Sequence, residues 1–221
     1  MLSLIVCAQV RHARLCFSLA SFYADDGTVV EPSAFPVPSP LHFHASLSSL
    51  AADTVLSGCV NETLSALAAA EQASRCERQT LKAALQELAE DETRHAALAW
   101  ATAEWCLQRG NDHAEDVLQG VQTAFQRALA GTAAVSLSVT ESDAAETALE
   151  AEGVLAPATE HALGRVVAAV LVRPWASLLC AGVTDKGEWV EVAASATEQL
   201  KQAGFPASGA AALHRWSATS A

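Results

Sequence analysis

Apolar residues recur at helical spacing along most of the chain. Near the start, one stripe of a helix holds Ile5, Ala8, His12, Leu15, Cys16 and Leu19. The same three-to-four-residue spacing predicts further helices over residues 46–75, 77–108, 113–130, 141–151, 158–181 and 187–203. Since 158–181 contains Pro174, we expect that helix to be kinked there.

Irregular segments separate these helices. Four prolines within residues 25–45 forbid a helix and predict an extended crossover. Apolar residues alternate over 132–140, which favours a short extended piece. We therefore expect a helical bundle over 1–131, a C-terminal helical extension over 132–205 that packs on the bundle, and a frayed tail over 206–221.

Composition supports an all-α fold and narrows the classes of partner. Hydrophobic residues make up 51% of the chain but aromatic residues only 5%, which suits close-packed helices better than sheets. The net charge of −12 and the lack of a basic cluster argue against nucleic acid and anionic membranes as partners. The most apolar run, 166–172, is interrupted by Arg173 and Pro174, so we expect no membrane span. Residues 1–10 are apolar but lack the basic leader of a signal peptide. We therefore expect a cytoplasmic location.

The six cysteines do not form a metal-binding pattern. No pair has the C-x-x-C spacing, and most of them stand among apolar helical positions. We interpret them as small, buried hydrophobic side chains in a reducing compartment, and not as ligands of zinc or an iron–sulfur cluster.

A short phrase occurs twice and carries the candidate chemistry. Arg-His-Ala-Arg-Leu begins at Arg11, and Arg-His-Ala-Ala-Leu begins at Arg94. In the second copy Glu92 precedes His95 by three residues, which places both side chains about 60° apart on one helix face. The first copy has Gln9 at the matching position, which cannot supply a charged ligand.

Glu62 and Glu92 both stand on apolar helix stripes next to small residues. A carboxylate on such a stripe is costly to bury unless it is paired, protonated or bound to a metal. With His95 and with His12 of the first copy, they form a candidate metal site between helices. The alternative is that the two carboxylates contact arginines, such as Arg11 or Arg94.

These residues resemble the ferritin-like superfamily. Its bundles build a two-metal centre from one Glu on each of two helices and Glu-x-x-His on the other two. Residues 58–64 (GCVNETL) and 91–96 (DETRHA) are similar to the second half of that site, and 8–16 (AQVRHARLC) to one helix of the first half. The resemblance covers roughly residues 1–110, and is strongest to bacterial ferritin-like proteins of uncharacterised function. It implies that Glu62 bridges or caps the metals, that Glu92 and His95 bind one metal ion, and that His12 binds the other.

The chain departs from the family pattern in two ways. Gln9 replaces an expected glutamate, and the helix that would carry the first glutamate would fall before Met1. We therefore expect a ferritin-like bundle without its first helix, with a degenerate site that holds one weakly bound ion or none. Iron is the expected metal, with manganese or no metal as alternatives, and the sequence does not decide whether the protein is an enzyme.

One further expectation follows from this interpretation, and two alternatives to it stay open. The apolar face of the missing helix should be covered by 158–181 or by a second copy in a homo-oligomer. A competing interpretation is a metal-free helical scaffold or interaction module that has lost the chemistry. A third is that Met1 is not the true start and that the complete protein has an intact site.

Overall fold

The structure is a computed structural model that describes residues 2–24, 27–34, 44–133 and 144–205. Within these ranges the regular elements are all helices and no strand occurs, which confirms the all-α prediction. Contacts divide the chain into two compact units, Met1–His44 and Ala45–Ala221.

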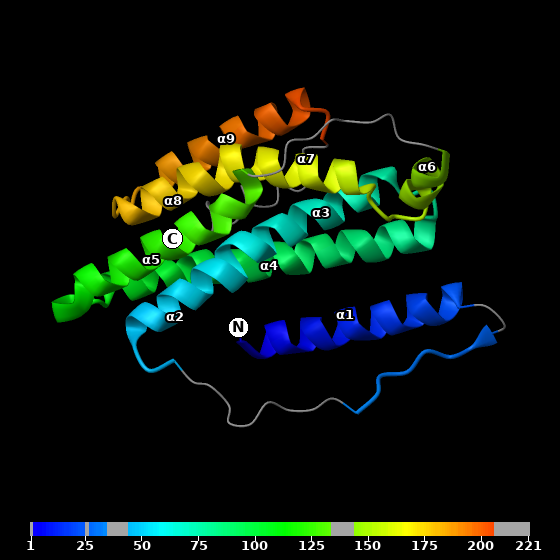
Figure 1. Cartoon of the computed structure of the whole chain (residues 1–221), viewed down its shortest axis with the longest axis horizontal. Helices are drawn as coiled ribbons and strands as arrows, with labels where there is room; N and C mark the ends of the chain where they lie inside the picture. The colour runs from blue at the N-terminus through cyan, green and yellow to red at the C-terminus, as the bar shows by residue number, and fades with distance from the viewer. Residues whose placement is uncertain (1, 25–26, 35–43, 134–143, 206–221) are drawn as a thin grey trace. The chain divides into compact units, whose positions relative to one another are not determined.

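The first unit contains α1, Leu2–Tyr23, and the chain that follows it (Figure 1). The Ser21 hydroxyl donates to the Phe17 carbonyl at 2.8 Å and accepts from the Val30 N–H at 2.8 Å. This contact folds the chain back beside the end of α1. Residues 28–34 are not helical, as the predicted crossover requires, while 35–43 lie outside the described residues.

The second unit begins with one long, uninterrupted helix. It consists of α2 (Leu47–Asp53), a π-helical segment (Thr54–Val60) and α3 (Asn61–Arg75). A short turn leads to α4, Gln79–Gln108, which packs along α3 over much of its length (Figure 1). The predicted helices over 46–75 and 77–108 are thus confirmed, although the π-helical segment was not foreseen.

The other α-helices of the second unit pack against this pair and against one another. They are α5 (Ala114–Ala133), α6 (Ala144–Ala151), α7 (Pro157–Val167), α8 (Arg173–Cys180) and α9 (Lys186–Gln202). In Figure 1, α9 in orange lies along α7 and α8 in yellow, which in turn contact α3 and α5. The extended piece predicted at 132–140 is wrong at its first two residues, which are helical because α5 continues through them. Residues 134–143 lie outside the described part.

Helices α7 and α8 form one continuous helix through Pro174. A π-helical segment, Ala168–Val172, joins them directly before the proline. Proline has no N–H and crowds the preceding turn, so a local change of helix geometry is expected at this point. The predicted helix over 158–181 is confirmed, with bounds of Pro157 and Cys180.

Three buried tryptophans organise the core of the second unit. The Trp100 ring packs edge-on against Trp175, with centroids 5.3 Å apart, and Trp175 lies 5.9 Å from Trp189. Each indole N–H has an oxygen partner: Trp100 donates to the Thr63 hydroxyl, Trp175 to the Trp189 carbonyl and Trp189 to the Val183 carbonyl. A buried indole N–H usually finds such a partner, because a buried donor left without one costs free energy. The cluster ties α4 to α8 and α9.

The segment Pro157–Cys180 is long and apolar enough to cross a membrane by length and composition alone. Its most apolar window has a mean hydropathy of 1.5, and 44% of that window is buried inside the protein. Val167, Leu171 and Trp175 on its buried face belong to the core described above. A core helix has the same composition, so the expectation of no membrane span stays a prediction.

Candidate metal centre

The α3–α4 pair brings three of the four predicted site residues together. Glu62 is at the beginning of α3, just after the π-helical segment, while Glu92 and His95 are one turn apart in the middle of α4. Because α3 and α4 run side by side, the start of α3 faces the centre of α4. Glu92 and His95, which were predicted from their spacing on one helix, therefore lie next to Glu62 from the other helix.

The His95 ring is the centre of the group. Its Nδ1 lies 3.0 Å from Glu92 Oε2 and 3.7 Å from Glu62 Oε2. One candidate ligand atom from each of the three residues falls within 4.8 Å of the others. Ligand atoms bound about 2.1 Å from a common ion lie roughly 3–4 Å apart. The three side chains therefore need only small movements to hold one ion.

Burial differs among the three side chains. His95 and Glu92 are buried, at 5% and 8% exposed, whereas the Glu62 side chain is 27% exposed. Their neighbours on the two helices include Ala66 and Ala96, both fully buried. Small side chains at these positions take up little volume around the group, and Glu62 is the member that solvent reaches most.

Arg94 does not take the role that the alternative interpretation gave it. Its Nη2 pairs with the carboxylate of Asp91, which is itself buried, on the same face of the helix. The pairing of Glu62 or Glu92 with Arg94 is therefore not supported by the ion pairs of α4. Arg11 belongs to the first unit, so its part in that alternative stays untested.

His12 also lies in the first unit, on α1. Its position relative to Glu62, Glu92 and His95 is not determined, and the prediction that it joins them stays a prediction.

The donor set determines which ions fit. Two carboxylates and one imidazole suit Fe(II), Mn(II), Co(II) and Zn(II), since oxygen and nitrogen donors are ligands of divalent first-row metals. The same atoms also satisfy one another without a metal, because one proton between His95 Nδ1 and Glu92 makes a hydrogen bond at 3.0 Å.

Among the described residues, the group that could hold a metal ion includes no cysteine. Burial raises the pKa of the Cys59 thiol well above its ordinary value, and it raises the pKa of the Cys106 thiol as well. A thiol must lose its proton to bind metal, so these two are poor ligands. Cys7 and Cys16 are exposed, which corrects the expectation that the cysteines are buried hydrophobic side chains.

A second charged cluster was not foreseen. Glu71 on α3 is 2% exposed and accepts from Arg75 Nε at 2.5 Å, while Arg75 Nη1 reaches Glu150 on α6 at 2.9 Å. The spacing of Glu71 and Arg75, four residues apart on a helix, was the available signal. The contact to Glu150 spans distant parts of the sequence, and no local pattern predicts it.

Comparisons with known proteins do not identify a family for this chain. No protein-family model matches the chain, and no match was found among curated proteins or among solved structures.

Proposed function

We propose that the protein binds one divalent first-row transition metal ion through Glu62, Glu92 and His95, with Fe(II) as the first candidate. The observation that carries the proposal is the convergence of these three side chains, from two helices, on one partly buried point. We further propose that the chain is a ferritin-like protein whose two-metal site has been reduced to a site for one metal. The repeated phrase and the Glu-x-x-His pair support this second statement.

Charge favours one ion over two. Two carboxylates neutralise a single divalent cation, whereas two cations would leave two positive charges uncompensated. Dications about 4 Å apart repel by roughly 16 kcal/mol at an effective dielectric near 20. Gln9, a neutral amide at the matching position of the first copy, cannot reduce that repulsion.

The three residues would contribute to metal binding in different ways. Glu92 and His95 are fixed by their burial in α4, and they provide a preorganised pair of ligand atoms. Glu62, which is more exposed, closes on the ion from α3. A redox-active ion held there, such as iron, would supply one-electron chemistry.

The competing function is a metal-free helical scaffold. The 3.0 Å contact between His95 and Glu92 favours it, because that contact satisfies both groups without an ion. Under this alternative the cluster is a structural pairing between α3 and α4.

Calorimetric titration with Mn(II), Co(II) and anaerobic Fe(II) separates the two functions. We expect Glu92→Gln and His95→Gln each to weaken binding at least about tenfold, since each removes a ligand. Glu90→Gln is the matched control, because Glu90 is an exposed carboxylate on the same helix. Full-affinity binding by the ligand variants would contradict the proposed site, and no binding by the unaltered protein would favour the scaffold. The variant His12→Ala tests the fourth predicted ligand in the same titration.

A further inference from the structure

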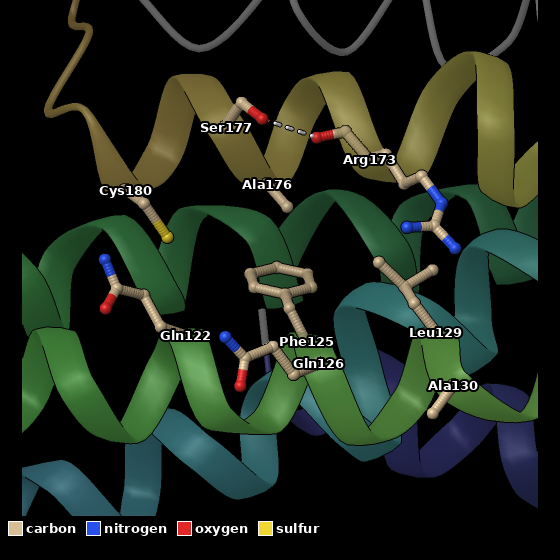
Figure 2. Close-up of a pocket in the computed structure, with 9 residues that line it drawn as sticks. All are labelled: Gln122, Phe125, Gln126, Leu129, Ala130, Arg173, Ala176, Ser177 and Cys180. Atoms are coloured by element: carbon tan, nitrogen blue, oxygen red, sulfur yellow. Dashed lines mark hydrogen bonds between the residues drawn. The ribbon is translucent and has the colours of Figure 1, made fainter.

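An open groove runs between α5 and α8, away from the residues of the candidate metal centre. It has a volume of about 780 Å³ and is lined by nine residues from these two helices (Figure 2). The floor is apolar: Phe125, Leu129 and Ala176 are each less than a tenth exposed. Volumes of about 300–1,000 Å³ are typical of sites for small organic ligands.

The charge of the lining is opposite to that of the chain. Arg173 is the one charged residue among those that line the groove, whereas the whole protein has a net charge of −12. Figure 2 shows the Arg173 side chain directed toward α5, near Leu129. Its guanidinium makes no hydrogen bond or ion pair with another described residue. An arginine beside an apolar floor, with no carboxylate in the lining, favours a ligand that carries an anionic group.

Two further features mark the groove as a candidate binding site: polar side chains at its rim and a π-helical segment next to Arg173. Gln122 and Gln126 present amides from α5, one turn apart, and both are exposed. Arg173 directly follows the π-helical segment Ala168–Val172. Such segments within α-helices are frequently found at functional sites.

The lined part of α5, from Gln122 to Ala130, is about 12 Å long. A short aliphatic chain fits this length and the apolar floor, with its head group at Arg173.

We propose that the groove binds a small amphipathic carboxylate, with the carboxylate at the Arg173 guanidinium and the aliphatic part over Phe125, Leu129 and Ala176. Guanidinium and carboxylate match in shape and make paired charge-assisted hydrogen bonds. Affinity is modest, because the Arg173 side chain is exposed and water screens the pair. This site is independent of the proposed metal site.

Calorimetric titration of the full chain with octanoate tests the proposal, with octylammonium and 1-octanol as probes of equal chain length. We expect saturable binding of one octanoate per chain, with octylammonium at least about tenfold weaker. The variant Arg173→Gln should weaken octanoate about fivefold or more. Arg127→Gln, on α5 and outside the lining, should leave the affinity unchanged.

A second variant fills the groove without disturbing the core. Ala130 is an exposed lining residue, so Ala130→Trp should abolish octanoate binding while thermal unfolding stays as in the unaltered protein. The proposal is overturned if octanoate fails to saturate, if octylammonium binds equally well, or if Arg173→Gln and Arg127→Gln behave alike. Light scattering that shows a dimer, dissociated by Ala130→Trp, would also overturn it, because a second copy would then occupy the groove. These titrations contain a chelator, so their outcome does not depend on the metal site.

Discussion

Arg75 holds two carboxylates together, and only one of them is deeply buried. Glu71 has 2% of its side chain exposed, and its second oxygen, Oε2, finds no hydrogen-bond partner among the described residues. Glu150 is better satisfied, because the Thr159 hydroxyl also donates to it, at 3.1 Å. Removing one partner of a buried pair leaves an uncompensated charge and usually costs more than the pair itself contributes.

We therefore expect Arg75→Met to lower the free energy of unfolding by about 2–3 kcal/mol at neutral pH, less than for a fully buried pair because Arg75 is a third exposed. Arg78→Met is the matched control. Arg78 pairs with Glu152 at the surface, and its loss should cost less than about 1 kcal/mol. Urea denaturation of both variants measures the difference. Equal losses would show that burial of Glu71 does not govern the energy of the cluster.

The same cluster makes stability depend on pH in two opposite ways. Burial raises the pKa of Glu71 above its ordinary 4.5, although Arg75 opposes the shift. For Glu150, burial is outweighed by hydrogen bonds and charge from Arg75 and by its other donors, so its pKa is lowered. The folded state thus holds a proton on Glu71 longer than the unfolded state does, and Glu71 costs stability as the pH rises above 4.5. Glu150 contributes stability that is lost as the pH falls below 4.5.

The variant Glu71→Gln isolates the first of these effects. Relative to the unaltered protein, its free energy of unfolding should increase as the pH rises above 4.5, because the variant has no proton to lose at this position. Denaturation curves recorded from pH 4 to pH 7 follow this difference. A difference that stays constant over the range would mean that Glu71 has the same pKa in the folded and unfolded states.

At the residue scale, the candidate site residues were predicted from a repeated phrase and from helix periodicity. Glu62, Glu92 and His95 meet because each lies on the apolar side of its own helix, and the two helices pack side by side. The pair of Asp91 and Arg94 was not predicted, although their spacing of three residues on one helix was an available signal. Glu150 could not be assigned to Arg75, because α6 and α3 meet only after the chain has folded.

The helix that carries Glu62 is not a regular α-helix along its whole length. The π-helical segment Thr54–Val60 ends just before Glu62, where the helix lies against α4. Gly58 permits this close approach, since a Cβ at that position would overlap the side chain of Ala99. The hydrophobic pattern predicted one helix over 46–75 correctly, but it contains no signal for the change from α to π geometry. In the helix 157–180, by contrast, Pro174 marks the position of the change in the sequence.

Two glycine substitutions on helices test this close contact. Gly58→Ala should destabilise the protein by about 1–3 kcal/mol, because the added methyl group overpacks the contact with Ala99. Gly164→Ala, on α7, meets no atom within 4 Å and should instead stabilise the protein by about 0.5–1 kcal/mol. Thermal unfolding of the two variants gives the comparison. Stabilisation of both variants would contradict the close contact between Gly58 of the π-helical segment and Ala99 of α4.

At the scale of the whole molecule, the all-α fold and the helix over 158–181 are confirmed, whereas the predicted division at residues 131 and 132 stays a prediction. The segment 157–180 packs into the core of the second unit through Val167, Leu171 and Trp175. That it covers the face of a missing helix, and that a homo-oligomer forms, stay predictions. The boundary between the two units at His44 lies at the end of the proline-rich segment, where the pattern already showed a break.

The number of metal ions that one chain holds tests the proposed site most directly. Two carboxylates and one imidazole, each supplying one ligand atom within 4.8 Å of the others, provide charge for a single divalent ion. The direct measurement is elemental analysis of protein purified without chelator, repeated after incubation with Fe(II) in the absence of oxygen. We expect close to one iron per chain, lost in Glu92→Gln and kept in Glu90→Gln. Two tightly held ions per chain, or none at all, would contradict the proposed site for one metal ion.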